Sequence, residues 1–320
     1  MTDVEQIRRA LATPLESTDL SELGDKYTGK VRDNYVTGDG RRYIVTTDRI
    51  SAFDRVLGTL PLKGQVLQWV TSFWFERTAA DSPNHVIATP DPNVMEVMEC
   101  EPLGAEMIVR AYLTGVTSTS IWTHYSQGKR VFCGHELPDG LVQNQRLETP
   151  ILTPSTKAAQ GDHDVSMSRE ELIAGGHISA EDFDLAAELA MKLFATGQAH
   201  CADQGLILVD TKYEFGKDKD GKVVVIDEIH TPDSSRFWFA ESYAERFAKG
   251  EPPESFDKEY VRRWLADQGF KGDGPIPAIP DEVKVEAVKR YIQACETITA
   301  TTFEPDLSDP TPRMRAALKI

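Results

Sequence analysis

Three charged side chains alternate along one short segment, and their spacing suggests shared chemistry. Asp210, Lys212 and Glu214 lie within a largely apolar run. Because successive side chains of a strand point to opposite faces, these three would share one face. A polar Asp220-Gly221 pair follows, and residues 223–226 are aliphatic again. The pattern predicts a β-hairpin with ionisable groups on one face.

The register of this hairpin decides whether it can bind a metal ion. If Asp220-Gly221 is a two-residue loop, Glu214 stands opposite Asp227, and two adjacent carboxylates are destabilising unless a cation intervenes. Lys212 offsets part of the repulsion, and a divalent ion that also binds phosphate oxygens offsets more. We therefore predict that Glu214 and Asp227 bind magnesium, although a slip of one residue would separate them. A solvated charged face is the alternative, but these strands are too apolar for an exposed ribbon.

A glycine-rich segment near the N-terminus has residues typical of phosphate binding. Residues 24–30 match the first seven positions of a P-loop, but Val31 stands where Ser or Thr would hold magnesium. Residues 31–36 also read as a strand, whereas a P-loop opens a helix. We therefore predict a strand-turn-strand cover over phosphates, as in protein kinases, with Lys30 and Arg32 facing the anion. An exposed polar strand remains the alternative.

Other polar residues lie within apolar strands or compact turns. Arg110 lies in a strand predicted over residues 106–113, where a buried cation must meet an anion or a carboxylate. Residues 231–236 combine a Pro-Asp turn, three hydroxyl side chains and an arginine, which suits a sugar or phosphate. A structural ion pair and an ordinary turn are the respective alternatives. His163 lies in a predicted irregular stretch, residues 138–165, and a histidine alone there is typical of a surface.

Hydrophobic periodicity indicates the elements that position these residues. We predict helices over residues 3–23, 65–80 and 281–301, a helix from Ser179 to about Gln204, and a helix ending at Gly269. Ser168 and Ser179 should be N-caps. We also predict a hairpin of residues 26–36 and 41–47, loop and edge structure over 81–104, and a Pro-rich tail. Trp69, Phe73 and Trp74 should lie in the core. Thr114-Gly115 should end an N-terminal lobe, residues 1–114, and begin a C-terminal lobe, residues 115–320.

Composition limits the class of protein. A chain of 320 residues is long enough for two domains. With 51 acidic and 35 basic residues, its net charge is −16, and no basic face is evident, which disfavours nucleic-acid partners. The four cysteines have no metal-binding spacing, and no apolar run reaches about 18 residues. We therefore predict a cytoplasmic protein without a membrane partner, and leave open whether it is a monomer or a homo-oligomer.

Seven ordered blocks of the sequence resemble the SAICAR synthetase family (phosphoribosylaminoimidazole-succinocarboxamide synthase). The resemblance runs from about Gly24 to Thr301 and is closest to the longer, fungal-type members. The blocks are Gly29-Lys30-Val31-Arg32-Asp33, residues 47–54, Val109-Arg110 with residues 112–115, residues 153–158, Gly161-Asp162-His163-Asp164, Asp210-Thr211-Lys212 with Glu214-Phe215-Gly216, and Asp227-Glu228 with residues 231–238.

The resemblance implies a two-lobed α+β fold, with an antiparallel β-rich N-terminal ATP lobe similar to that of kinases and a larger α/β C-terminal lobe. It implies an ATP-dependent ligase that joins the carboxylate of carboxyaminoimidazole ribonucleotide to the amine of L-aspartate. ATP is the co-substrate, Mg²⁺ the cofactor, and an acyl phosphate the expected intermediate. A small-molecule kinase with the same hairpin and metal carboxylates is the alternative.

Residue roles follow from the same resemblance. It places ATP on Lys30, Arg32 and the backbone of Glu106, Met107 and Ile108, magnesium on Glu214 and Asp227, and the ribonucleotide around Arg110, Lys212, Asp210, Asp233 and Arg236. We assign catalysis to Lys212 and Asp210, with Asp210 as a base. Ser235 joins the substrate-binding residues, and Ser155, Lys157 and His163 are assigned to the aspartate site.

One departure from the family pattern concerns a phosphate ligand. Family members place a Ser directly after the Thr-Gly pair, whereas residues 116–119 intervene here before Ser120. We predict that Ser120 is the equivalent. Ser118 and Thr117 remain alternatives.

Overall fold

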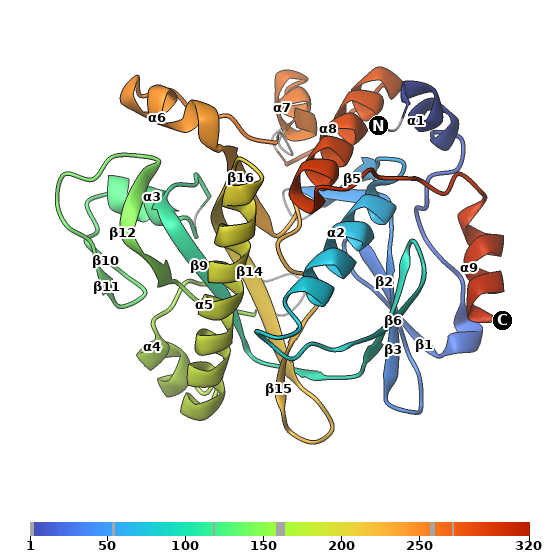
Figure 1. Cartoon of the computed structure of the whole chain (residues 1–320), viewed down its shortest axis with the longest axis horizontal. Helices are drawn as coiled ribbons and strands as arrows, with labels where there is room; N and C mark the ends of the chain where they lie inside the picture. The colour runs from blue at the N-terminus through green and yellow to red at the C-terminus, as the bar shows by residue number, and fades with distance from the viewer. Residues whose placement is uncertain (1–2, 53–54, 118, 158–163, 257–259, 271) are drawn as a thin grey trace. The chain divides into compact units, whose positions relative to one another are not determined.

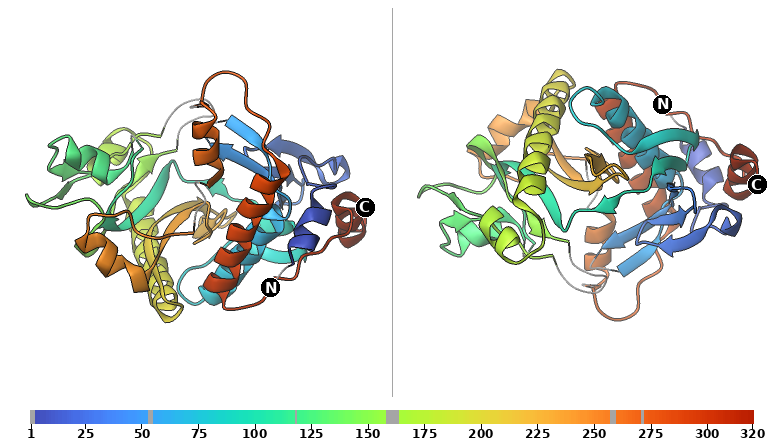
Figure 2. Two further views of the ribbon diagram at one scale, coloured as in Figure 1. Left: turned by 90° about the horizontal axis from the view of Figure 1, so that it is seen from above. Right: turned by 90° about the horizontal axis from the view of Figure 1, so that it is seen from below.

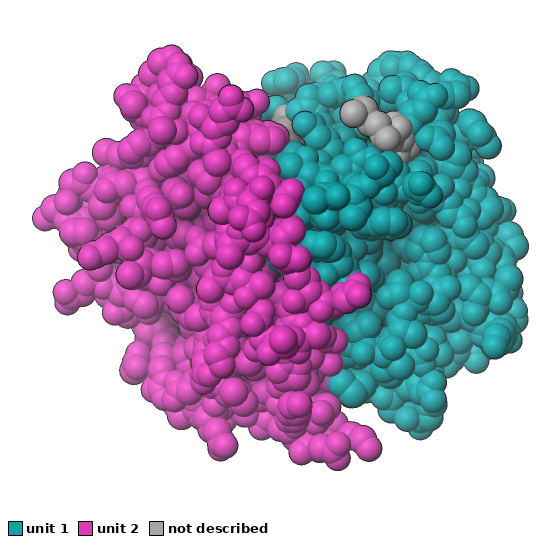
Figure 3. Space-filling model, viewed as in Figure 1, with its two compact units in different colours: residues 1–75, 85–99, 256–320 teal, residues 76–84, 100–255 magenta. Residues whose placement is uncertain are grey.

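The computed structural model describes residues 3–52, 55–117, 119–157, 164–256, 260–270 and 272–320 (Figure 1). The chain divides into two compact units, residues 1–75, 85–99 and 256–320 (unit 1) and residues 76–84 and 100–255 (unit 2) (Figure 3). These bounds differ from the predicted division at residue 114. The strand β9 (Ala105–Leu113) belongs to unit 2, and the C-terminal residues return to unit 1.

Unit 1 contains a five-stranded antiparallel sheet in the order β1-β2-β3-β7-β6. Its strands are β1 (Asp25–Thr28), β2 (Arg32–Val36), β3 (Arg41–Thr46), β6 (Val86–Asp91) and β7 (Val94–Met98), and a separate pair is formed by β4 (Arg49–Ala52) and β5 (Arg55–Thr59). The predicted hairpin is confirmed as β2–β3, and β1 joins β2 through residues 29–31, which supports the strand-turn-strand interpretation. The prediction of loop and edge structure for residues 81–104 is correct only in part, because β7 lies between β3 and β6 inside the sheet.

The helices of unit 1 correct two predictions. They are α1 (Val4–Ala10), α2 (Lys63–Arg77), which reaches the boundary of the unit, α7 (Tyr260–Asp267), α8 (Asp281–Thr299) and α9 (Pro310–Leu318). Residues 3–23 do not form one helix, since Pro14 disfavours helical backbone at the residue before it. The tail is helical because Asp309 caps α9 and Pro310 suits its first turn. In the aromatic stripe, Trp74 is buried but Trp69 is 38% exposed.

The buried His85 gives unit 1 a sensitivity to acid. Its ring lies 5.6 Å from that of Phe75, and burial, reinforced by Arg42 and Arg32, lowers its pKa from 6.5 to about 3. The unfolded chain therefore takes up this proton near pH 6.5 and the folded chain only near pH 3. The contribution of the neutral His85 to the free energy of unfolding is therefore fully present above pH 6.5. It falls by about 1.4 kcal/mol per pH unit as the pH drops toward 3.

Replacing His85 with leucine should therefore flatten the acid side of the stability curve. We expect the Tm of His85→Leu to fall less than that of the wild type between pH 7 and pH 4.5, as measured by circular dichroism. The exposed His177 provides the control, because His177→Leu should leave the wild-type slope intact. An unchanged slope in His85→Leu would contradict the assignment.

Unit 2 is built on a seven-stranded sheet in which β14 (Leu206–Lys217) is the central strand. It pairs with β9, β15 (Val223–Ile226), β16 (Ser235–Phe239) and β8 (Glu101–Pro102), while β12 (Gln145–Leu152) and β13 (Ser155–Thr156) pair with β9. The long helix α5 (Ala180–Asp203) packs against β14 and β9 (Figure 2). Residues 138–165 are thus less irregular than predicted, because they include β12 and β13.

The remaining elements of unit 2 are α3 (Ile121–Ser126), the short pair β10 (Val131–Phe132) and β11 (His135–Glu136), α4 (Arg169–Ala174) and α6 (Ala240–Ala248). Ser168 and Ser179 cap α4 and α5 as predicted. Mixed helices and antiparallel sheets confirm the α+β class. Among the helices of the described ranges, none has the length and apolar character needed to cross a membrane.

Candidate active site

The β14–β15 hairpin is confirmed, but its register differs from the prediction. Glu214 lies opposite Ile226. Beyond the strand ends, the amide of Asp218 donates to the carbonyl of Lys222 at 3.0 Å, so three residues, 219–221, form the loop between this last hydrogen-bonded pair. Gly221 occupies the left-handed position that ends such loops, with φ +79°. The predicted opposition of Glu214 and Asp227 is therefore wrong, and Asp227 follows β15 with φ +67°.

Four charged side chains of unit 2 form what we call the lysine–glutamate cluster: Glu106, Lys157, Lys212 and Glu214. Lys212 Nζ lies 2.6 Å from Glu106 Oε1 and 2.9 Å from Glu214 Oε1. Lys157 Nζ lies 2.5 Å from the other oxygen of Glu214. The pairing of Lys212 with Ile108 brings Glu106 of β9 beside Glu214 of β14. An ammonium group thus lies between two carboxylates from neighbouring strands.

The electrostatics of this cluster keep its central pair charged. Burial favours the neutral form of Glu214, but Lys212 and Lys157 outweigh it and lower the pKa of this carboxyl to about 2. Burial likewise opposes the charge of Lys212, yet Glu214 and Glu106 raise its pKa above the ordinary value. The pKa of Glu106 is raised, chiefly by burial, against the opposing effect of Lys212. At neutral pH the cluster therefore presents an ammonium that is 38% exposed beside an ionised carboxylate.

A second group, which we call the arginine–aspartate cluster, consists of Arg110, Asp210 and Arg236. In the strand pairing Asp210 is opposite Arg110 on β9 and opposite Arg236 on β16. Its Oδ2 atom lies 3.3 Å from Arg110 Nη1 and 3.1 Å from Arg236 Nη1. Arg110 is also held by Thr153, whose hydroxyl accepts from Nε at 2.7 Å. Two guanidinium groups share one carboxylate, which leaves one positive charge for an anion.

Arg236 is the more accessible member of this cluster. Its side chain is 34% exposed, against 6% for Arg110. Its buried Nη1 is close to Asp210 but makes no hydrogen bond within the part of the chain that the structure describes. A donor in this state fits a ligand oxygen.

The segment after β9 brings Ser120 to the arginine–aspartate cluster. Ser120 is buried at the N-cap of α3, and its hydroxyl lies 2.7 Å from that of Thr117. A Cβ atom built on Gly115 would lie 2.4 Å from Ser120 Oγ and 2.8 Å from Arg236 Nη1. Ser120, which we predicted as the phosphate ligand, and Thr117, one of the two alternatives, therefore lie side by side. Ser118, the other alternative, lies outside the described residues.

Other predicted substrate residues lie near one cluster or the other. Ser235 is buried on β16, with its hydroxyl 2.7 Å from that of Thr211, and Asp233 lies in the preceding turn, where its amide donates to Thr231. Ser155 donates to Glu106 Oε2 at 3.3 Å. His163 lies outside the residues that the structure describes.

The backbone of Glu106, Met107 and Ile108, on which the resemblance places the adenine of ATP, is not an open strand edge. On one side of β9, Met107 and Ile108 pair with β14; on the other, Glu106 pairs with Ser155, and the carbonyl of Ile108 accepts from the Thr153 amide at 2.7 Å. At these positions β9 is therefore flanked by backbone partners on both sides, and the role of its backbone in binding ATP stays a prediction. The short strand β13, which pairs with Glu106 and Ala105, was not predicted.

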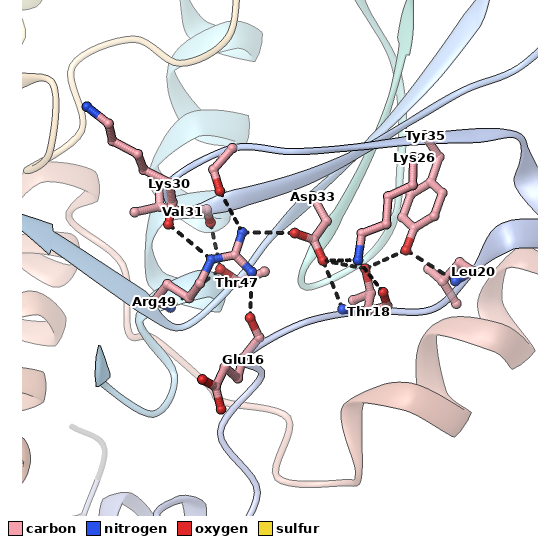
Figure 4. Close-up of polar contacts among 11 residues, drawn as sticks. Glu16, Thr18, Leu20, Lys26, Lys30, Val31, Asp33, Tyr35, Thr47 and Arg49 are labelled. Atoms are coloured by element: carbon pink, nitrogen blue, oxygen red, sulfur yellow. Dashed lines mark hydrogen bonds and ion pairs between the residues drawn. The ribbon is translucent and has the colours of Figure 1, made fainter. Parts of the chain in front are cut away.

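The glycine-rich turn of unit 1 lies over a buried arginine that sequence analysis did not single out. Lys30 is in the turn and Arg32 begins β2. Arg49 donates to the carbonyls of the turn and to the Asp33 carboxylate (Figure 4). In the sequence this arginine stood only within the block of residues 47–54 that resembles the family, and no role was assigned to it.

The carboxylates predicted to hold magnesium have the appropriate chemistry, but in a different arrangement. No cluster of three or more His, Cys, Asp or Glu side chains suited to a metal occurs among the residues described. Mg²⁺, however, is commonly held by one or two carboxylates together with substrate phosphates and water. Glu214 is ionised and suits this role, although both of its oxygens lie close to lysines. A metal ion there would displace or share the contact with Lys157.

Comparison with known proteins identifies the family. The sequence profile of SAICAR synthetase matches residues 25–277. The phosphoribosylaminoimidazole-succinocarboxamide synthase of Legionella pneumophila (strain Paris) is 49% identical over 292 residues, which covers 91% of this chain and 92% of that protein.

Solved structures agree with this result. The SAICAR synthase of Saccharomyces cerevisiae complexed with SAICAR is 31% identical, with a TM-score of 0.78, and the match covers 91% of this chain and 100% of that one. A type-2 SAICAR synthetase in complex with ADP has the same fold, with a TM-score of 0.66 at 23% identity over 88% of this chain and 100% of that one. The chain therefore belongs to the SAICAR synthetase family of ATP-dependent ligases of purine biosynthesis.

Proposed function

We propose that the protein joins the carboxylate of carboxyaminoimidazole ribonucleotide to the amine of L-aspartate, with ATP converted to ADP and phosphate. The observation that supports this substrate most directly is the arginine–aspartate cluster. Arg110 and Arg236 share one carboxylate oxygen, and Arg236 keeps a donor for an anion. A ribonucleotide 5′-phosphate is such an anion, and Ser120 supplies a hydroxyl beside it. We place Asp233 and Ser235 around the ribose.

The chemical problem is the activation of a carboxylate, which is a poor electrophile because its charge is delocalised. Phosphoryl transfer from ATP gives an acyl phosphate, and the protein contributes positioning and charge stabilisation to this step. Lys212 suits that role because its partly exposed ammonium lies on the same face of β14 as Asp210. The amine of aspartate then attacks, and the acyl carbon must be kept from water. We assign Lys157 and Ser155 to aspartate binding, with Lys157 facing its carboxylates.

Asp210 has two roles in this proposal. Its contacts with Arg110 and Arg236 suit a counter-ion that orients both guanidinium groups. Its role as a base stays a prediction, which Asp210→Asn tests. Unchanged turnover of that variant at saturating substrates would exclude the base role. The expected cytoplasmic location also stays a prediction.

We further propose that Glu214 and Asp227 bind Mg²⁺ together with the phosphates of ATP. When bound, the ion would neutralise charge on the transferring phosphoryl group. The affinity for Mn²⁺ in the presence of ADP tests this without turnover. Glu214→Gln should weaken Mn²⁺ binding about tenfold or more, because it removes an ionised ligand. The exposed Glu148→Gln should bind as the wild type does, and equal affinity of the two variants would contradict the assignment.

One assay separates the ligase from other nucleotide-binding proteins. ADP formation is measured with carboxyaminoimidazole ribonucleotide, with and without L-aspartate. The ligase should form ADP and the succinocarboxamide in equal amounts only when aspartate is present. A kinase would form ADP without aspartate at the same rate, and a binding module would form none; either result would overturn the proposal.

A further inference from the structure

Consecutive carbonyl groups of the glycine-rich turn in unit 1 point to one side. The carbonyls of Gly29 and Lys30 accept hydrogen bonds from Arg49 Nη2 and Nε, each at 3.0 Å. The carbonyl of Val31 accepts from the Thr47 amide at 3.0 Å and from its hydroxyl at 2.7 Å. Three successive carbonyls thus face Thr47, which follows β3, and Arg49, which begins β4 (Figure 4).

Arg49 is itself held firmly in place. Its side chain is 7% exposed, and Nη2 lies 2.8 Å from Asp33 Oδ1, whose carboxylate is fully buried. Its Nη1 donates to the carbonyl of Glu16. The second oxygen of Asp33 accepts from the amide and the hydroxyl of Thr18, each at 2.8 Å. The guanidinium is therefore a fixed point to which the turn is attached, and each of its three nitrogens is used.

Peptide geometry then determines where the amide groups of the turn point. In a trans peptide the carbonyl of one residue and the N–H of the next are antiparallel, and the structure has no cis peptide bonds among its described residues. Because the carbonyls of Gly29 and Lys30 point at Arg49, the N–H groups of Lys30 and Val31 point away from it. The side chain of Lys30 also extends away from Arg49 (Figure 4). The amides of Lys30 and Val31 and the side chain of Lys30 therefore lie on the side of the turn remote from Arg49.

We propose that Arg49 is a positioning residue for nucleotide phosphates. It orients the peptide groups of the turn so that the Lys30 and Val31 amides, with the Lys30 side chain, form an anion-binding surface. Successive backbone N–H groups that point to one side of a turn suit phosphate oxygens. The inference rests on the proposed binding of ATP phosphates by this turn. It adds that a residue with no contact to the nucleotide sets the affinity for the phosphates.

The test compares ATP with adenosine, because only ATP carries phosphates. The dissociation constants of both ligands are measured by calorimetry for the wild type and for Arg49→Lys. Lysine keeps the charge but cannot reproduce the planar fork that reaches several acceptors. We expect Arg49→Lys to weaken ATP about tenfold and to leave adenosine within about twofold, since hydrogen bonds to charged groups are at stake. Equal weakening of both ligands, or of neither, would overturn the proposal.

A milder variant and a matched control guard against a general loss of folding. Thr47→Val removes the hydroxyl bond to the Val31 carbonyl at 2.7 Å and the long bond of 3.4 Å that this hydroxyl accepts from the Arg49 amide. It should weaken the binding of ATP about threefold. Arg313 is the control, because it is also a largely buried arginine of unit 1 that pairs with a buried aspartate, Asp91 at 2.8 Å. Arg313→Lys should lower the Tm but leave the ATP-to-adenosine ratio unchanged. If Arg313→Lys lowered this ratio as much as Arg49→Lys, the proposal would be refuted.

Lys30→Ala separates this inference from the proposal on which it rests. If Lys30→Ala leaves the ATP-to-adenosine ratio unchanged, the turn does not bind the phosphates and the proposed site is wrong. If Lys30→Ala lowers the ratio but Arg49→Lys and Thr47→Val do not, the site stands and the role of Arg49 is wrong. The KM values provide a second measurement. Arg49→Lys should raise the KM for ATP and leave the KM for L-aspartate unchanged.

Discussion

Replacing Lys212 with methionine should lower kcat/KM by about a hundredfold or more, as expected when a charge-stabilising donor is lost from an active site. Methionine keeps much of the aliphatic length of lysine but removes the ammonium that lies between Glu106 and Glu214. Two carboxylates from adjacent strands would then face each other, and Lys157 would remain paired with one of them, Glu214. We expect the free energy of unfolding to fall by about 2 kcal/mol, less than for a fully buried pair because water screens the partly exposed site.

The loss of stability in Lys212→Met should depend on pH. Without Lys212, the effect of burial raises the pKa of Glu106 further, so the folded chain holds this proton at a higher pH than the unfolded chain does. Stability from a carboxyl with a raised pKa is present at low pH and is lost as the pH rises through the folded value. The difference in Tm between the variant and the wild type should therefore be larger at pH 8 than at pH 5.

Lys217 offers a matched control on the same strand. It also pairs with a carboxylate, Asp182 at 2.9 Å, but its side chain lies outside the lysine–glutamate cluster. Lys217→Met should retain wild-type turnover and should change stability by less than about 1 kcal/mol, as is usual for exposed ion pairs. Comparable losses of activity in both lysine variants would show that the position of Lys212 has no special importance.

Replacing Gly115 with alanine should selectively weaken the binding of the ribonucleotide. The added Cβ would lie 2.4 Å from Ser120 Oγ and 2.8 Å from Arg236 Nη1, at a φ of +96°. Ser120 and Arg236 must then move apart, and both are proposed phosphate ligands. We expect the dissociation constant for the ribonucleotide to rise by about tenfold or more, since at least one charge-assisted hydrogen bond is disturbed. The constant for ATP should stay within about twofold of the wild-type value, because no ATP ligand is disturbed.

Gly128 separates the steric effect from backbone strain. It has a similar φ of +88°, but a Cβ there meets no atom within 4 Å. Gly128→Ala should therefore cost about 1 to 2 kcal/mol of stability through its left-handed backbone and leave ribonucleotide affinity intact. Isothermal titration with the ribonucleotide measures both variants. If the two variants lose affinity equally, the proposed phosphate site cannot include the neighbourhood of Gly115.

Local patterns in the sequence predicted most of the elements but not their register. Alternation along residues 206–215 indicated β14, and Ser168 and Ser179 marked two helix starts correctly. The opposition of Glu214 and Asp227 failed because one hydrogen bond closes a three-residue loop, and the choice between loop lengths is not visible in the Asp220-Gly221 pair. A shift of one residue changes every partner along the strand.

Contacts between distant parts of the chain could not be predicted from local sequence patterns. Glu106 was singled out for its backbone, whereas its side chain meets Lys212, which is 106 residues away in the sequence. Arg49 carried no motif of its own, and its function becomes visible only when β1 and β2 fold over it. In the tail, Asp309-Pro310 is a recognisable helix start, but the density of prolines suggested a loop instead.

The continuity of β14 has a consequence for selectivity. One uninterrupted strand of 12 residues carries both Asp210 and Lys212, and their Cα atoms are separated by about 7 Å because the backbone is extended. Pairing on both sides prevents the strand from stretching or sliding, so the distance between the two charged groups is fixed. The site should therefore select a ligand by the distance between its phosphate and its carboxylate. An analogue with one atom more or fewer between these groups should bind more weakly, even if every functional group is retained.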